Sequence, residues 1–234
     1  VKSVESNGST VHAYQKIPYD AVVIGSGLRP NPSDSSRQDT MFVLQDRNII
    51  TKSAGYDGVP IPQALKMSHL YDVTSAPADH NSVESLAQFS TRRGWYYNFK
   101  DKGEKNLSAA TILNGKVFFT SYVPEEENAN SAICLAGGVG RLYGFNLNYG
   151  YRAYTKEHVE VGQRVPDTPQ LVIPADSDGN TQMHLIGIGN AAAQLERRKD
   201  SEGNYLDDCP ETDKLCLGQS LNKQKVYYFQ DEIN

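Results

Sequence analysis

Asp20-Ala-Val-Val-Ile-Gly-Ser-Gly27, followed after a Pro/Ser-rich loop by Thr40-Met-Phe-Val-Leu-Gln-Asp46, is the stretch of sequence that decides the fold. Its pattern returns in Gly115-Lys-Val-Phe-Phe-Thr-Ser-Tyr122 and then in Gly140-Arg-Leu-Tyr-Gly-Phe-Asn-Leu147. In each copy an apolar strand ends in small polar residues, and a second strand with alternating apolar residues follows a loop. The copies are about 95 to 101 residues apart, and this repeat predicts two pairs of adjacent antiparallel strands.

Further strand-like segments surround the repeats, at 11–15, 95–99, 170–173, 182–188 and 226–230. Asn114-Gly115 separates two short apolar segments and predicts a tight hairpin with a type I′ turn. Helix is expected only in an insertion at about 50–93. There a capping-box pattern begins at Asn81, and a second short stretch covers 63–71.

These features predict an all-β chain and, more specifically, part of a β-propeller with antiparallel strands and a short helical insertion. Runs of apolar residues in the strands suggest that both faces of each small sheet are covered, as in stacked blades. A two-sheet sandwich is the alternative, and it would show cleaner alternation. We expect one domain over residues 1–234 with about two to three blades, the other blades lying upstream of Val1.

The charge and the apolar runs of the sequence argue against two classes of protein, those that bind nucleic acid and those that span a membrane. The net charge is -5, and basic residues are scattered, so direct binding of nucleic acid is not expected. The longest apolar runs are no longer than a strand, which argues against a membrane span.

Three stretches together resemble the C-terminal propeller of the PilY/PilC-type tip-associated adhesins of bacterial type IV pili. They are Tyr19–Pro32 with Met41–Asp46, then Gly94–Phe99 with Gly103–Lys105, and finally Lys116–Pro124 with Cys134 and Gly140–Leu147. The order and spacing of these motifs also match, so the resemblance covers about residues 19 to 150. Val226–Gln230 is similar to the closing strand of that family.

The resemblance implies a non-enzymatic role in pilus assembly against retraction, in adhesion and in twitching motility. The implied location is extracytoplasmic, at the pilus tip or the outer membrane surface of a Gram-negative bacterium. The implied partners are minor pilins, the remaining blades, and a host or surface ligand. The family's adhesive N-terminal region is absent from these residues, and its calcium loop is expected upstream of Val1.

Patterns for catalysis and metal binding are missing from the sequence, so we expect no catalytic residues, cofactor or metal site here. Asp176–Asn180 has alternating oxygen ligands, but an EF-hand loop would need Gly and Glu where Thr181 and Gly187 stand, and a hairpin turn is favoured. The alternative functions are a quinone-dependent dehydrogenase-type propeller and a lectin-like scaffold. The first would require several tryptophans around its cofactor, and the chain has one.

Aromatic residues supply the candidates for a binding surface. Trp95, between a glycine and two tyrosines, is interpreted as a core residue, with a binding platform as the alternative. Tyr149, Tyr151 and Tyr154 are expected to be exposed in a loop and to mark a partner surface.

The first testable prediction concerns Cys209 and Cys216, which bound a short polar loop in a chain that we expect to be secreted. We predict a disulfide between them, worth about 2 to 3 kcal/mol on the chain-entropy model. Two free thiols are the alternative, and Cys134 is then either free or paired outside this chain. Peptide mapping under non-reducing conditions will show the linked peptides, and the prediction fails if both thiols are alkylated without reduction.

Overall fold

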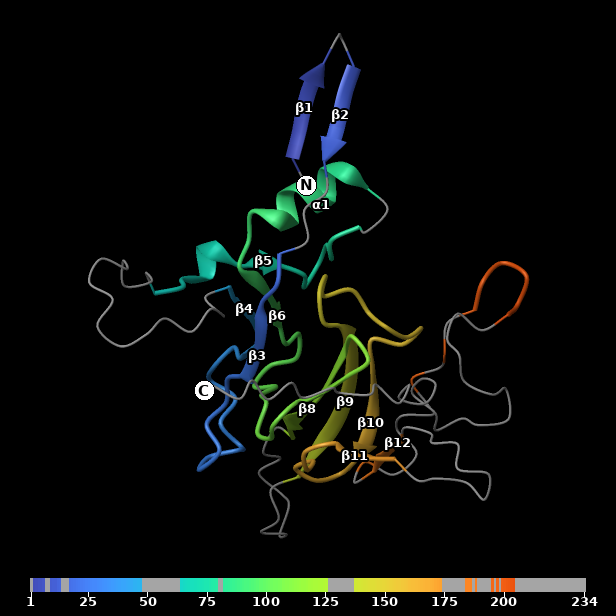
Figure 1. The fold of residues 1–234 in the computed structure, drawn as a ribbon. Helices are drawn as coiled ribbons and strands as arrows, with labels where there is room; N and C mark the ends of the chain where they lie inside the picture. The colour runs from blue at the N-terminus through green and yellow to red at the C-terminus, as the bar shows by residue number, and fades with distance from the viewer. Residues whose placement is uncertain are drawn as a thin grey trace, which may run out of the picture.

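The computed structural model describes residues 2–6, 9–13, 17–47, 64–79, 82–125, 137–173, 184–186, 188, 195, 197 and 199–204. Only the backbone is described for 2–6 and 9–13. Within these ranges the chain is mostly β-sheet with one α-helix (Figure 1).

The first sheet contains the first copy of the repeat and has the strand order β3-β4-β6-β5. β3 (Asp20–Gly25), β4 (Thr40–Asp46) and β6 (Gly94–Asn98) are antiparallel neighbours. The short edge strand β5 (Tyr71–Asp72) pairs in parallel with β6, which departs from the expected antiparallel pairing.

The second sheet contains the second copy and is an antiparallel meander, β10-β9-β8-β7. Its strands are β7 (Thr111–Leu113), β8 (Lys116–Pro124), β9 (Gly138–Asn146) and β10 (His158–Gly162). Both turn residues between β7 and β8 have positive φ, 46° at Asn114 and 69° at Gly115. This is the backbone of a type I′ turn, so the predicted hairpin is confirmed.

Two hairpins complete the described strands. β1 (Lys2–Ser6) pairs with β2 (Ser9–Ala13), and this hairpin projects from the body of the fold (Figure 1). β11 (Gln170–Val172) pairs with β12 (His184–Ile186) beside the second sheet.

The helix expected after Asn81 in the insertion at about 50–93 is confirmed, while residues 50–63 lie outside the described residues. α1 (Val83–Ser90) begins after Ser82, whose side chain accepts a hydrogen bond from the backbone N–H of Ser85. The helix expected over 63–71 is wrong, because Met67–His69 forms a single 3₁₀ turn and the chain then enters β5. Among the described residues, no helix has the length and apolar character needed to cross a membrane.

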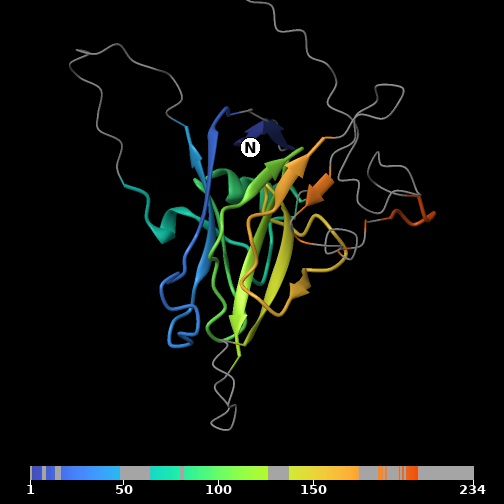
Figure 2. The same ribbon diagram turned by 90° about the horizontal axis from the view of Figure 1, so that it is seen from below.

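The two four-stranded sheets pack face to face on an aromatic core (Figure 2). The rings of Phe119 and Tyr143, on neighbouring strands of the second sheet, stack with centroids 5.0 Å apart. Trp95 and Tyr97 of the first sheet pack against Phe145 of the second, with centroid distances of 5.9 and 5.1 Å. Aromatic side chains of both sheets therefore pack against one another across the interface.

The other face of the second sheet is covered as well. Phe118 and Leu142 point away from the first sheet and are buried in a second cluster, which contains Leu185 of β12, Ile188 and Leu195. The second sheet is thus a middle layer. Within the described residues, only one face of the first sheet is covered, and Val22 and Ile24 on the outer face of β3 are 48% and 57% exposed.

This architecture confirms the coarser fold prediction, an all-β chain with mainly antiparallel sheets in which each copy of the repeat is a pair of adjacent antiparallel strands. A sandwich has two layers, whereas the described residues form a third on the second sheet. They do not include a closed ring of blades, and 226–230 lies outside the described residues.

The second prediction tests the core. Trp95 is 0% exposed, and its indole N–H donates to the carbonyl oxygen of Leu147 at 2.8 Å, so the platform interpretation is wrong. Trp95→Ala should lower the free energy of unfolding by about 3 to 5 kcal/mol, because it leaves a large cavity between the sheets. Met67→Ala, at an exposed position, is the control. Equal denaturation midpoints for the two variants would contradict the core assignment.

Candidate functional site

Residues 103–108 connect the two copies of the repeat. The backbone N–H of Asn106 donates to the carbonyl of Ser26 at 3.0 Å, and its side-chain amide donates to the carbonyl of Thr120 at 2.7 Å. Lys105 and Tyr122 exchange two backbone hydrogen bonds. In each copy of the repeat, this segment is therefore hydrogen-bonded to the small polar residues that end the apolar strand.

Gly25 and Gly27 permit this close approach. A Cβ atom at Gly25 would lie 2.4 Å from the Asn106 side chain, and one at Gly27 would lie 2.3 Å from the Asn106 carbonyl oxygen. The Gly-Ser-Gly sequence at the end of β3 is thus explained by backbone packing.

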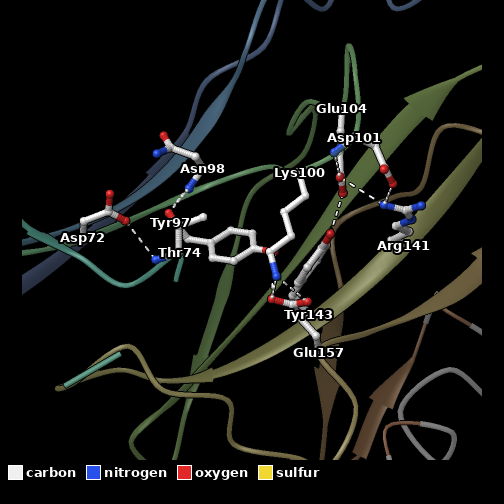
Figure 3. Close-up of polar contacts among 10 residues, drawn as sticks. All are labelled: Asp72, Thr74, Tyr97, Asn98, Lys100, Asp101, Glu104, Arg141, Tyr143 and Glu157. Carbon is white, nitrogen blue, oxygen red and sulfur yellow. Dashed lines mark hydrogen bonds and ion pairs between the residues drawn. The ribbon is translucent and has the colours of Figure 1, made fainter. Parts of the chain in front are cut away.

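Glu104 is the centre of a buried polar network (Figure 3). Its carboxylate is 0% exposed and accepts from the hydroxyl groups of Ser121 and Tyr143, each at 2.5 Å. The guanidinium of Arg141 donates to the same carboxylate at 3.0 Å and also pairs with Asp101. A buried charge is tolerated when it is paired and hydrogen-bonded in this way.

Burial and the neighbouring carboxylates shift the pKa values of Tyr143 and Arg141. Burial, followed by the charge of Glu104, raises the pKa of the Tyr143 phenol, so the phenol remains a donor. Burial alone would lower the pKa of Arg141, but Glu104 and Asp101 raise it. Tyr143 and Arg141 therefore both remain donors at neutral pH.

A second polar link lies nearby in the same view (Figure 3). The Tyr97 hydroxyl donates to Glu157 at 3.1 Å, and the ammonium of Lys100 is 2.7 Å from the same carboxylate. Burial, followed by Glu157, raises the pKa of Tyr97. This link ties the first sheet to the segment before β10.

Lys105 holds the loop between β3 and β4. The residue is buried, and its ammonium donates to the backbone carbonyl oxygens of Pro32 and Asp34 at 2.8 and 2.6 Å. Burial lowers the pKa of Lys105, while Asp39 and Asp34 act in the opposite direction. The ammonium thus fixes the backbone of this loop through hydrogen bonds to its carbonyl oxygens.

These buried groups are a structural assembly. Glu104, Ser121 and Tyr143 are sealed from solvent, so a ligand or substrate could not reach them without disruption of the sheet interface. Sequence reasoning did not identify Glu104, although the Gly103–Lys105 motif containing it was part of the resemblance.

The tyrosine surface requires a correction. Tyr154 is 4% exposed and packs on Phe118, because Gly144 opposite it leaves room for the ring, so the expectation of an exposed residue is wrong. Tyr149 and Tyr151 are half-buried, and their rings stack with centroids 6.4 Å apart. Their role as a partner surface stays a prediction.

Tyr151 and Tyr154 are brought together in the wall of a cavity of about 480 Å³. The other lining residues come from the loop between β5 and α1, from the segment after β9, and from the chain near Lys199; they are Pro77, Ala78, Asp79, Arg152 and Thr155. The volume is within the usual range for a small-molecule site.

The structure does not describe the other predicted site residues. Cys134, Cys209, Cys216 and the turn at 176–180 lie outside the described residues. The described part of the chain contains no group of three or more His, Cys, Asp or Glu side chains that could hold a metal ion.

Comparison with known proteins gave no match to any family model, curated protein or solved structure.

The third prediction tests the buried network. Glu104→Ala should lower the free energy of unfolding by about 3 to 5 kcal/mol, because Arg141 then loses its buried counter-charge and two hydroxyl groups lose their acceptor. Glu160→Ala, at an exposed position of β10, should change it by less than about 0.5 kcal/mol. Chemical denaturation measures both. If Glu104→Ala does not fold, Glu104→Gln, which keeps the shape but not the charge, should remain measurably less stable than wild type. A Gln variant as stable as wild type would show that the charge is dispensable.

Proposed function

We propose that this chain is part of a β-propeller that acts, without catalysis, in the assembly of type IV pili at the bacterial surface. The observation that carries the proposal is the difference between the faces of the two sheets. The middle sheet is covered on both faces, whereas no described element covers the outer face of the first sheet, which is apolar and has Val22 and Ile24 exposed. A blade at the boundary of an incomplete propeller would have this property.

The outer face has a composition that suits burial. Val22 and Ile24 of β3 pair with Leu44 and Phe42 of β4, and Phe42 pairs in turn with Tyr96 of β6. These five side chains form a continuous apolar stripe across three strands. A stripe of this kind marks a surface for association. In the proposal, its occupant is the preceding blade of the same polypeptide.

The pilus role itself is supported by the resemblance of residues 19 to 150 to the tip-associated adhesins. Three of its motifs have a defined place in the fold: the end of β3, the Gly103–Lys105 connection and the β8–β9 pair. On this proposal the chain is extracytoplasmic, at the pilus tip or outer membrane, and its partners are minor pilins.

Of the two alternative functions, a lectin-like scaffold is better supported than a quinone-dependent dehydrogenase. A quinone-dependent dehydrogenase would stack its cofactor on tryptophan, but the single Trp of this chain is enclosed between the sheets and bonded to Leu147. A ligand-binding, lectin-like scaffold is favoured by the cavity beside Tyr151. The two remaining functions, assembly and ligand binding, use different surfaces.

The fourth prediction tests the assembly role in the source bacterium. Val22→Lys combined with Ile24→Lys places two charges on the outer face, where they oppose docking of a blade. We expect loss of surface pili and twitching while retraction is active, and recovery of pili when the retraction motor is inactivated.

Val165→Lys, at another exposed apolar position, is the matched control and should leave piliation unchanged. Immunoblotting must show the parent protein at normal abundance in both strains. Normal piliation in the double lysine strain would contradict the proposed role of this face.

A further inference from the structure

The cavity beside Tyr151 lies where connections from both sheets meet. Pro77, Ala78 and Asp79 follow β5 of the first sheet, and residues 151–155 follow β9 of the second. A ligand in this cavity would therefore contact both halves of the described fold, at a site separate from the apolar stripe on β3 and β4.

The charges of the lining favour an anion. Arg152 and Lys199 are exposed basic residues at the cavity, and Asp79 is its one acidic residue. Within the described part of the chain, the guanidinium of Arg152 has no hydrogen bond or ion pair. In a chain with a net charge of -5, this basic site is unusual. A free guanidinium pairs with a carboxylate through two parallel hydrogen bonds.

The other lining groups favour a sugar ring as the body of the ligand. The Tyr151 ring is held in place, because it stacks on Tyr149 and its hydroxyl accepts from the Asn146 amide at 3.2 Å. The negative face of a fixed aromatic ring attracts the polarised C–H groups of a pyranose. Thr155 supplies a hydroxyl group for the hydroxyl groups of the sugar.

We propose that this cavity binds a carboxylated saccharide, with Arg152 on the carboxylate and Tyr151 against the ring. The inference deepens the ligand-binding side of the proposed function, but it does not depend on propeller closure or on pili. Loss of saccharide binding with normal piliation, or the reverse, would separate the two proposals.

The test is a titration of the 234-residue chain with glucuronate, glucose and inorganic phosphate, followed by NMR or calorimetry. Glucuronate should bind more tightly than glucose by about tenfold, the effect of one charge-assisted contact. Added salt should weaken the binding of glucuronate and leave that of glucose nearly unchanged.

Arg152→Met should remove the advantage of glucuronate over glucose, and the exposed position predicts an unchanged melting temperature. Arg164→Met, also at an exposed arginine, is the matched control and should bind like wild type. Equal affinity for glucose and glucuronate, an Arg152→Met variant that retains the preference, or absence of saturable binding would overturn the proposal. Phosphate binding as tight as that of glucuronate, with the same dependence on Arg152, would also overturn it in favour of a general anion site.

Discussion

Burial of the second sheet on both faces is the constraint on which the rest of the structure depends. Side chains that alternate along β8 enter two different cores, so Val117 and Phe119 face one cluster while Phe118 faces the other. A strand in this position cannot show the alternation of apolar and polar residues that is typical of a half-exposed sheet. Its sequence instead contains the continuous apolar run Val117–Phe119, which is followed by Thr120 and Ser121.

Thr120 and Ser121 need hydrogen-bond partners, because a hydroxyl group that is buried without a hydrogen bond destabilises the fold. Residues 103–108 supply the partners. Ser121 donates to Glu104, and Thr120 is bonded to the hydroxyl of Ser108. Burying Glu104 in turn requires a cation, which Arg141 of β9 provides. The apolar sheet, the connecting segment and the buried ion pair are therefore mutually dependent.

The sequence was sufficient to predict features that depend on nearby residues. The strand pairs β3–β4 and β8–β9 and the Asn114-Gly115 turn follow from local patterns and turn chemistry. Features set by distant contacts were not predicted. β10 has one fully buried residue, Val159, and so gives little apolar signal. The side chains that donate to Glu104 are 17, 37 and 39 residues away, and the burial of Tyr154 depends on Gly144 in another segment.

Strand propensity does not explain the apolar stripe on the first sheet. Val22 and Ile24 are β-branched, and strand propensity alone can account for such residues at exposed positions. Phe42 and Leu44 on the adjacent strand continue the same face, however, and the Phe42 ring lies 6.5 Å from that of Tyr96. Propensity acts on single residues and does not align apolar side chains across three strands. Alignment of this kind is characteristic of a surface that packs on another layer, as the inner faces of these same sheets do. In the function that we propose, the first sheet is an internal layer, and binding of the neighbouring blade to it would stabilise the whole assembly.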